Sequence, residues 1–300
     1  MSELILRTRE LTRRYGRTLA LDRASLSVEK GQILGLVGRN GAGKTTLIRL
    51  ISGQSRPTSG ELALFGASSP SALDRARSRT GVMVETPAFY PYLTAEQNLE
   101  YYRIQRGIPG RSCVDEALEL VRLTGAGKKK FKTFSLGMKQ RLGLALALMN
   151  QPEFLLLDEP INGLDPEGIV EFRELLLRLN RERQTTILIS SHILSELSAL
   201  ATHYAFIDRG RMLETISAAD LRERCRDCLE LRVDDAARAA QVLEEQLGTR
   251  DFEVLPQERL RLYAFLDQPQ TVNRVLMEQG VGLISAQQKD SNLELSLIHI

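Results

Sequence analysis

The stretch GRNGAGKT, at residues 38–45, constrains the fold more than any other part of the sequence. It fits the pattern G-x-x-x-x-G-K-[ST], with its two glycines at Gly38 and Gly43. Glycines let successive backbone N–H groups turn inward around phosphate oxygens, and such a loop needs a strand before it and a helix after it. The apolar run GQILGLVG precedes the motif, and KTTLIRLISG, with helical spacing and a glycine stop, follows it. The sequence therefore predicts a strand, a phosphate-binding loop and a helix, and a chance glycine turn is disfavoured.

The polar residues of this loop predict a site for a nucleoside triphosphate. Lys44 would reach the β- and γ-phosphates, and Thr45 would bind Mg²⁺ through its hydroxyl. The N-terminus of the following helix adds a partial positive charge at the same place. We expect the nucleotide to contact Asn40, Gly41 and Thr46 as well, because they lie in or directly after the loop.

A second motif, FLLLDEP at residues 154–160, supplies acidic groups. Its apolar run predicts a buried strand, and ligands bind beyond the carboxyl ends of strands in open α/β sheets. Asp158 would hold Mg²⁺ through water, and Glu159 would orient or deprotonate an attacking water. An apolar strand that ends in an acidic pair is a weak indication alone, because strands often end in surface carboxylates. The phosphate-binding loop upstream makes the functional interpretation the stronger one.

The hydrophobic pattern alternates between strands and helices over residues 1–215 and predicts one α/β domain. Residues 3–9 and 19–29 alternate loosely and predict antiparallel strands, and TTILISS predicts a buried strand after the helix GIVEFRELLLRLN. Residues from about 88 to 150 have helical spacing and predict a helical subdomain. Strands that alternate with helices imply a mostly parallel sheet covered on both faces.

The pattern changes after about residue 216. Residues 216–294 read in the order β-α-β-β-α-β, the ferredoxin-like order, and contain no catalytic constellation. We therefore expect a small accessory α+β domain there, reached through residues 214–222. The last six residues, LSLIHI at 295–300, follow a polar stretch abruptly and match the translation of a common sequencing adapter, so we expect a non-native tail.

Composition and charge exclude several classes of protein. The net charge of +2, from 40 basic and 38 acidic residues, gives no reason to expect nucleic acid as the main ligand. No apolar run approaches the roughly 18 residues that span a bilayer, and the charged N-terminus does not resemble a signal peptide. Cys225 and Cys228 form a lone CxxC pair without a second pair or nearby histidines, which favours free thiols. These features predict a cytoplasmic protein.

The stretch FSLGMKQR, at residues 134–141, contains no acid and no metal ligand but precedes a helical pattern. Ser135 is expected to cap that helix, because serine is a preferred N-cap residue. A helix N-terminus with a serine hydroxyl and the Gly137 backbone exposed is also a site for a phosphate. Since the chain already has one phosphate-binding loop, a second and distant one suggests a site that another copy completes.

Together these motifs resemble those of the ATP-binding cassette ATPases, over residues 1 to about 220. The resemblance implies that the Ser135 turn of one subunit covers ATP held by the other. The match is to a looser form of the signature, because Leu136 stands where the commoner LSGGQ has glycine. The resemblance also implies that Tyr15, in RRYG, stacks on adenine, with a plain surface tyrosine as the alternative.

Two further residues match the same family. Asp165, in NGLDP, matches a loop that contacts the partner subunit, and with Pro166 it also fits the N-cap and N1 positions of a helix. His192, in ISSH, matches the switch histidine that senses the γ-phosphate, the alternative being a structural histidine.

One position departs from the commonest family pattern. The family usually has glutamine after the third core strand, and GVMVETPAFYP places Glu85 there. The stretch resembles that of the subgroup that exports bacitracin-like and lantibiotic peptides, in which glutamate is usual. The resemblance implies that Glu85 binds Mg²⁺ weakly or couples the ATPase to its membrane partner.

The resemblance implies a P-loop NTPase fold, with a RecA-like core, an antiparallel β layer and a helical subdomain. It implies an Mg²⁺-ATP-hydrolysing subunit that pairs with an identical or related chain. The pair would drive a separate membrane permease from the inner face of the membrane, docked at residues 85–105. The expected cargo is an antimicrobial peptide or similar amphipathic compound. A cassette ATPase acting on ribosomes or DNA is one alternative, disfavoured because such proteins usually have two cassettes or a long coiled coil. A sensory transporter subunit is the other.

Overall fold

The computed structural model describes residues 3–84 and 88–289. The chain divides into two compact units, residues 1–218 and residues 219–300. Each unit has its own hydrophobic core, one around the first two sheets and one around a third sheet. The suspected non-native tail, residues 295–300, lies outside the described residues.

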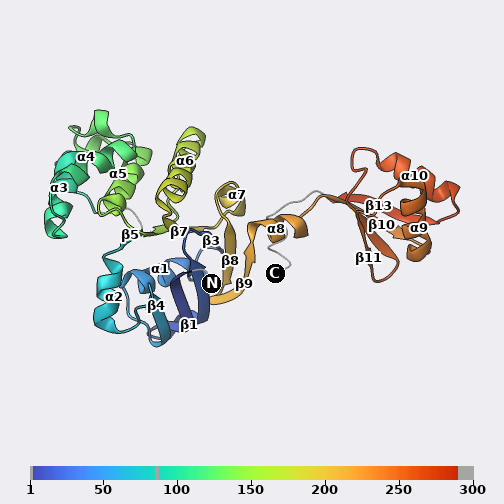
Figure 1. The fold of residues 1–300 in the computed structure, drawn as a ribbon, viewed down its shortest axis with the longest axis horizontal. Helices are drawn as coiled ribbons and strands as arrows, with labels where there is room; N and C mark the ends of the chain where they lie inside the picture. Colours follow the sequence, from blue (N-terminus) through green and yellow to red (C-terminus); the bar gives the residue numbers. More distant parts are fainter. Residues whose placement is uncertain (1–2, 85–87, 290–300) are drawn as a thin grey trace. The chain divides into compact units, whose positions relative to one another are not determined.

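The first unit is built on a six-stranded sheet with the order β5-β6-β7-β3-β8-β9 (Figure 1). Five neighbouring strands are parallel, and β9 at the edge pairs antiparallel to β8. Strands β3, β6 and β7 are buried along their whole length, as their apolar runs predicted. In chain order the strands are β3 (Ile33–Val37), β5 (Thr80–Met83), β6 (Phe154–Asp158), β7 (Thr186–Ser191), β8 (His203–Asp208) and β9 (Arg211–Ser217).

A second, antiparallel sheet forms another layer of this unit, with the order β2-β1-β4. Its strands are β1 (Leu4–Tyr15), β2 (Thr18–Glu29) and β4 (Ser59–Leu64). The predicted antiparallel pair is therefore confirmed, with β1 and β2 each longer than predicted. Helix α1 (Lys44–Ser52) buries Leu47, Ile48 and Leu50, and one hydrophobic cluster joins this helix to both sheets. The phosphate-binding loop thus begins and ends on elements fixed in one core.

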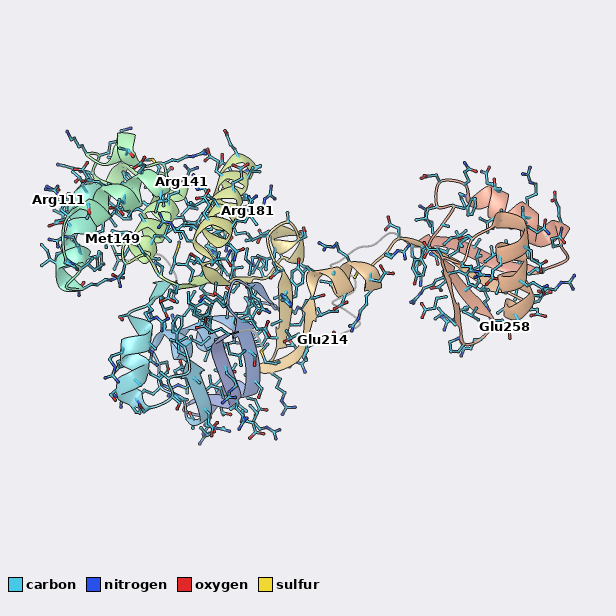
Figure 2. The ribbon with its side chains drawn as sticks, viewed as in Figure 1. Arg111, Arg141, Met149, Arg181, Glu214 and Glu258 are labelled. Carbon is cyan, nitrogen blue, oxygen red and sulfur yellow. The ribbon has the colours of Figure 1, made fainter. Side chains whose placement is uncertain are left out.

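The helical subdomain contains α3 (Ala95–Gln105), α4 (Ser112–Leu120) and α5 (Leu136–Leu148), drawn in green in Figure 1. Helix α5 buries every residue from Leu142 onward, and Met149 after it, which is labelled in Figure 2, is also buried. This explains why its sequence is apolar on all sides, since a helix of that kind needs neighbours all round. The other helices of the unit are α2 (Pro70–Arg77), α6 (Pro166–Arg183) and α7 (Leu194–Leu197).

The second unit has the element order β-α-β-β-α-β, preceded by α8 (Ala218–Arg224). Its four strands pair antiparallel in the order β11-β12-β10-β13, and its two helices bury apolar faces against them. The elements are β10 (Cys228–Val233), α9 (Ala236–Leu247), β11 (Phe252–Leu255), β12 (Arg259–Leu262), α10 (Pro269–Glu278) and β13 (Leu283–Lys289).

The segment expected to lead into the accessory domain, residues 214–222, contains the end of β9 and most of α8, and the boundary between the two units falls within it. Strand β9 is held by antiparallel pairing to β8, a partner that the local sequence does not reveal. Within the described residues, no helix is long and apolar enough to cross a membrane.

Candidate active site

The phosphate-binding loop lies between the end of β3 and the start of α1, as predicted. Gly43 has φ +112°, and a Cβ there would lie 2.8 Å from the Ala20 carbonyl, so a larger residue is excluded. A Cβ at Gly38 would collide with the carbonyl of Ile207. The loop therefore needs glycine at both positions because the neighbouring backbone approaches it closely.

Lys44 is held at this loop by three contacts. Its Nζ donates to the carbonyl oxygens of Gly38 at 2.6 Å and Arg39 at 3.2 Å. It also lies 3.1 Å from Oε1 of Glu159, and only 5% of the side chain is exposed. The ammonium is therefore fixed where the loop turns its backbone inward, and its charge is balanced by one carboxylate.

Asp158 ends strand β6, and both of its carboxylate oxygens accept hydrogen bonds from hydroxyls. Oδ2 accepts from Thr45 Oγ1 at 2.6 Å, and Oδ1 accepts from Ser190 Oγ at 2.6 Å. The hydroxyl proton of Thr45 is directed at Asp158, which leaves its oxygen lone pairs free for a cation. Hydroxyl and carboxylate oxygens are the ligands that Mg²⁺ prefers, so this pair fits such an ion.

Within residues 3–84 and 88–289, acidic and imidazole side chains alone do not make a metal centre. Among the residues that the structure describes, no group of three or more His, Cys, Asp or Glu side chains could hold a metal ion. A magnesium ion bound by Thr45 and Asp158 would therefore need oxygens from water and phosphate. Mg²⁺ typically keeps several waters and binds through one or two protein groups plus substrate phosphates. Glu85, the third predicted ligand, lies outside the described residues.

Glu159 follows Asp158 but points in a different direction. Its backbone has φ +46°, the left-handed conformation that non-glycine residues rarely adopt. Besides the ion pair with Lys44, its Oε2 lies 2.9 Å from Nδ1 of His192 and 3.5 Å from Nδ2 of Asn162. The side chains of Glu159 and His192 are 22% and 31% exposed, so solvent reaches this carboxylate.

The predicted residues of three distant segments thus meet at one edge of the sheet. They come from the start of α1, the end of β6 and the residues that follow β7, and β6 and β7 are neighbours. The residues brought together are Lys44, Thr45, Asp158, Glu159 and His192. Sequence reasoning missed Ser190, because a serine inside an apolar strand carries no motif of its own.

The turn at Ser135 forms a separate group. Ser135 caps α5, with its Oγ accepting from the backbone N–H of Met138 at 3.3 Å, so the predicted N-cap is confirmed. A Cβ at Gly137 would lie 3.3 Å from the Leu164 side chain, because the starts of α5 and α6 approach each other there. A cavity of about 420 Å³ opens between these two helix starts and is lined by Ser135, Gly137, Asp165 and their neighbours. Among the described residues, no hydrogen bond or ion pair links Ser135 to the phosphate-binding loop.

Asp165 occupies the N-cap position of α6 with Pro166 after it, as predicted. Its side chain, however, makes no capping hydrogen bond. The N-cap and N1 positions expected for Asp165 and Pro166 are therefore confirmed, although the Asp165 side chain accepts no capping hydrogen bond. Its Oδ1 lies over Gly168 instead, where a Cβ would be only 2.7 Å away. The carboxylate is thus left without the hydrogen bonds that a capping residue usually makes.

Tyr15 ends strand β1 and is 41% exposed. Its hydroxyl lies 3.2 Å from Ser55 Oγ, and the Arg13 guanidinium lies 4.4 Å from the ring centroid. The hydrogen bond with Ser55 is the largest influence and lowers the pKa of Tyr15; burial opposes it, and the neighbouring Arg13 lowers the pKa further. An exposed ring that is oriented by two neighbours can stack on a planar ligand.

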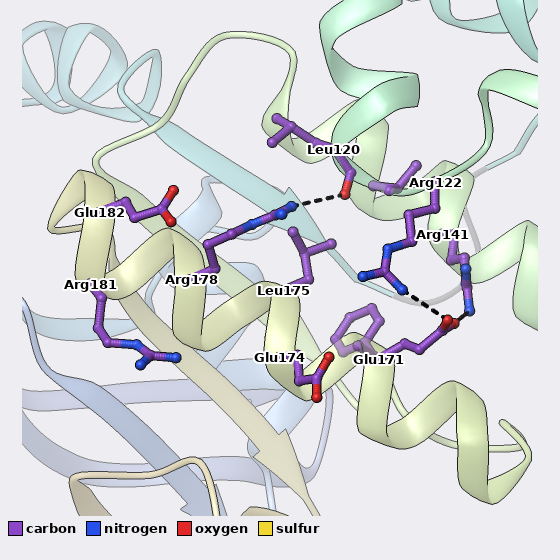
Figure 3. A pocket seen from close by; sticks show the side chains of 11 residues that line it. Leu120, Arg122, Arg141, Glu171, Glu174, Leu175, Arg178, Arg181 and Glu182 are labelled. Carbon is purple, nitrogen blue, oxygen red and sulfur yellow. Dashed lines mark hydrogen bonds and ion pairs between the residues drawn. The ribbon is translucent and has the colours of Figure 1, made fainter.

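A cavity of about 520 Å³ separates α6 from the helical subdomain but contains none of the predicted catalytic residues (Figure 3). Glu171 on α6 forms ion pairs across it with Arg122, at 3.0 Å, and with Arg141 on α5. The pKa of Glu171 is lowered, first by the hydrogen bond with Arg141. The ion pair with Arg141 joins α6, whose N-cap is Asp165, to α5, whose N-cap is Ser135.

Residues 21–162 match the family model described as ABC transporter. The chain is 42% identical over 290 residues to the bacitracin transport ATP-binding protein BcrA of Bacillus licheniformis, covering 97% of this chain and 95% of that protein. It is 38% identical over 209 residues to the lantibiotic transport ATP-binding protein SrtF of Streptococcus pyogenes, covering 70% of this chain and 89% of that one. A solved ATP-binding subunit of an ABC transporter is 27% identical, with a TM-score of 0.65 over 73% of this chain and 92% of that one.

Proposed function

The chain belongs to the ABC transporter family and is the ATP-hydrolysing subunit of such a transporter, and we propose that it powers a separate permease. The permease would export a bacitracin-like peptide. The observation that carries the proposal is the set of contacts joining Lys44 to Glu159 and Thr45 to Asp158 at one sheet edge. The similarity to a bacitracin transport protein over nearly the whole of both chains supports the peptide class.

The phosphate-binding residues have distinct proposed roles. The backbone N–H groups of the loop 38–43 surround the phosphates, and the Lys44 ammonium neutralises the β- and γ-phosphate oxygens. Thr45 and Asp158, which are hydrogen-bonded to each other, would hold Mg²⁺, and the exposed ring of Tyr15 would stack on adenine. When bound, Mg²⁺ supplies further neutralisation of charge on the phosphate oxygens.

Glu159 is the proposed general base. Its carboxylate accepts a proton from a water whose oxygen forms a bond to the γ-phosphorus, while the bond from that phosphorus to the bridging oxygen breaks. The electron pair of the broken bond leaves with ADP, and the products are ADP and phosphate. His192, at 2.9 Å from Oε2, holds the carboxylate in place. A positioned base of this kind contributes roughly 10²- to 10⁴-fold to the rate.

The Ser135 turn and Asp165 serve a partner chain in this proposal. Their cavity has a helix N-terminus on each side, and helix N-termini attract phosphate. The proposed partner is a second copy or a related cassette, whose ATP would be covered by Ser135 and Gly137. Two nucleotides would then be enclosed between two chains.

The permease is proposed to dock on an aromatic patch of the helical subdomain, formed by Tyr90, Tyr92, Tyr101 and Ile104. These side chains are 44%, 73%, 42% and 63% exposed. Tyr90 and Tyr101 contact each other edge-to-face at 4.8 Å between ring centroids, which joins these two residues of the patch. Large exposed apolar side chains that gather in one place mark interaction surfaces. Docking there would hold the protein at the inner face of the membrane.

The test is to trap the Glu159→Gln protein with Mg²⁺ and ATP in cells of its source and identify the proteins that co-purify with it. A stoichiometric multi-span membrane protein is expected, and ribosomal or DNA-bound partners would overturn the transport proposal. Ile104→Asp should abolish recovery of the membrane protein. Met277→Asp, at an equally exposed residue of the second unit, should not.

A further inference from the structure

Ser190 occupies a position where one hydroxyl contacts both acidic residues of the site. It is fully buried at the end of β7, and it lies directly opposite Asp158 in the register of β6 and β7. Its Oγ donates to Asp158 Oδ1 at 2.6 Å and accepts from the backbone N–H of Glu159 at 3.0 Å. A single side chain therefore satisfies one carboxylate oxygen and the next peptide group.

The contact with Asp158 matters because this acidic residue is buried, with 8% of its surface exposed. A buried charge is costly unless hydrogen bonds compensate it. In the described part of the chain, its side-chain partners are two hydroxyls, those of Thr45 and Ser190. Thr45 holds one carboxylate oxygen, Oδ2. The hydroxyl of Ser190, which binds the other oxygen, Oδ1, therefore sets the rotation of the carboxylate plane. That rotation in turn sets which oxygen lone pairs face the phosphate-binding loop.

The contact with Glu159 acts on the backbone. The peptide N–H of Glu159 donates to Ser190, at the residue where the chain adopts φ +46°. Such a conformation persists only where surrounding contacts enforce it. The turn directs the Glu159 side chain toward Lys44 and His192 rather than alongside Asp158. The neighbouring Ser191 does not share this role, because its hydroxyl donates to Glu196 at 2.6 Å.

We propose that Ser190 is a positioning residue for the ATPase reaction, which sets the orientation of the Asp158 carboxylate and the backbone turn of Glu159. The inference rests on the proposed roles of these two acidic residues. It predicts a defect both in the response of nucleotide binding to Mg²⁺ and in the rate of hydrolysis. A hydroxyl that only stabilised the fold would produce neither defect at a temperature where the protein is folded.

The test compares Ser190→Ala with a matched control, Thr186→Val, in the full chain. Thr186 lies at the other end of β7, is equally buried, and accepts a hydrogen bond from the Gly31 N–H at 3.0 Å. Both variants remove one buried hydroxyl from the same strand. The affinity for a fluorescent ATP analogue is measured in Mg²⁺ and in EDTA, together with kcat, KM and the melting temperature.

In Ser190→Ala, kcat is expected to fall about 10- to 100-fold. The factor by which Mg²⁺ increases the affinity for ATP should fall by a similar amount, which is the usual effect of removing a residue that hydrogen-bonds to a metal ligand. Affinity in EDTA should change less than threefold, whereas KM measured with Mg²⁺ should rise together with the lost Mg²⁺-dependent affinity. Thr186→Val should melt at a similarly lowered temperature with kcat unchanged. Ser190→Thr, which keeps the hydroxyl, should recover kcat. The inference would be overturned if Ser190→Ala kept a normal kcat and a normal response to Mg²⁺, as Thr186→Val should. It would also be overturned if Ser190→Thr had the melting temperature of the wild type but a kcat as low as that of Ser190→Ala.

Asp158→Asn, measured in parallel, separates this inference from the proposed site. If Asp158→Asn loses the Mg²⁺ response and Ser190→Ala keeps it, the site stands and the role of Ser190 is wrong. If Asp158→Asn itself keeps both the Mg²⁺ response and normal turnover, the assignment of Asp158 is wrong and the inference falls with it.

Discussion

Replacing Glu159 by glutamine should tighten ATP binding while it slows hydrolysis, because Glu159 competes with phosphate for Lys44. The Lys44 Nζ lies 3.1 Å from Oε1. At that distance and an effective dielectric constant of about 20, the attraction is about 5 kcal/mol before the cost of removing both charges from water. Most of that attraction is offset by desolvation, so we expect a net effect of about 1.4 kcal/mol, which is tenfold in affinity.

Equilibrium binding of a fluorescent ATP analogue and steady-state release of phosphate measure the two effects on one preparation. The expected result for Glu159→Gln is affinity about tenfold tighter, with turnover about 10²- to 10⁴-fold slower. Glu196→Gln is the matched control, because Glu196 accepts from Ser191 and has no ion pair among the described residues. Unchanged or weaker ATP affinity in Glu159→Gln would refute the competition between carboxylate and phosphate.

Two further predictions concern charge. Lys44→Ala should weaken ATP binding at least about 100-fold in an equilibrium titration, because a hydrogen-bonded charge pair with phosphate is worth roughly 3 kcal/mol. Unchanged affinity would show that this loop does not bind the phosphates. Glu171→Gln should lower the free energy of unfolding by about 1 kcal/mol at pH 7, measured in urea. The Glu171 pKa is lowered in the folded protein, so its contribution is present above the unfolded pKa of about 4.3 and disappears as pH falls through the folded value. Glu174→Gln, on the same helix, is the control. If wild type and Glu171→Gln were equally stable at pH 7, or if Glu174→Gln lowered the free energy of unfolding as much, the ion pairs of Glu171 would not stabilise the fold.

The parts of the fold that the sequence predicted well are those with local causes. The run before Gly38 and the run before Asp158 are apolar at every position, and they form strands that are buried throughout. Ser135 caps α5 because its preference acts on a backbone N–H only three residues away. Different roles were expected for Asp158 and Glu159, and the left-handed backbone at Glu159, with φ +46°, accompanies different directions of the two side chains.

The parts that could not be predicted depend on partners distant in sequence. Strand β9 exists by pairing with β8, and the register that places Ser190 opposite Asp158 joins residues 32 positions apart. Asp165 had the right position for a cap, but the sequence did not indicate that its side chain would make no capping hydrogen bond. The intrinsic preferences of the residues indicate where helices and strands lie along the chain. Which strands pair, and which rotamers the side chains adopt, is set by the packing of the folded core.

Helix α1 packs in one hydrophobic cluster with both sheets, and this has a consequence for the energetics of the nucleotide. A binding loop that must be ordered by its ligand loses affinity to the entropy of that ordering. Here the element behind the loop is immobilised before any ligand arrives, with Leu47, Ile48 and Leu50 fully buried. The free energy of phosphate binding is therefore available for work elsewhere, such as drawing two chains together.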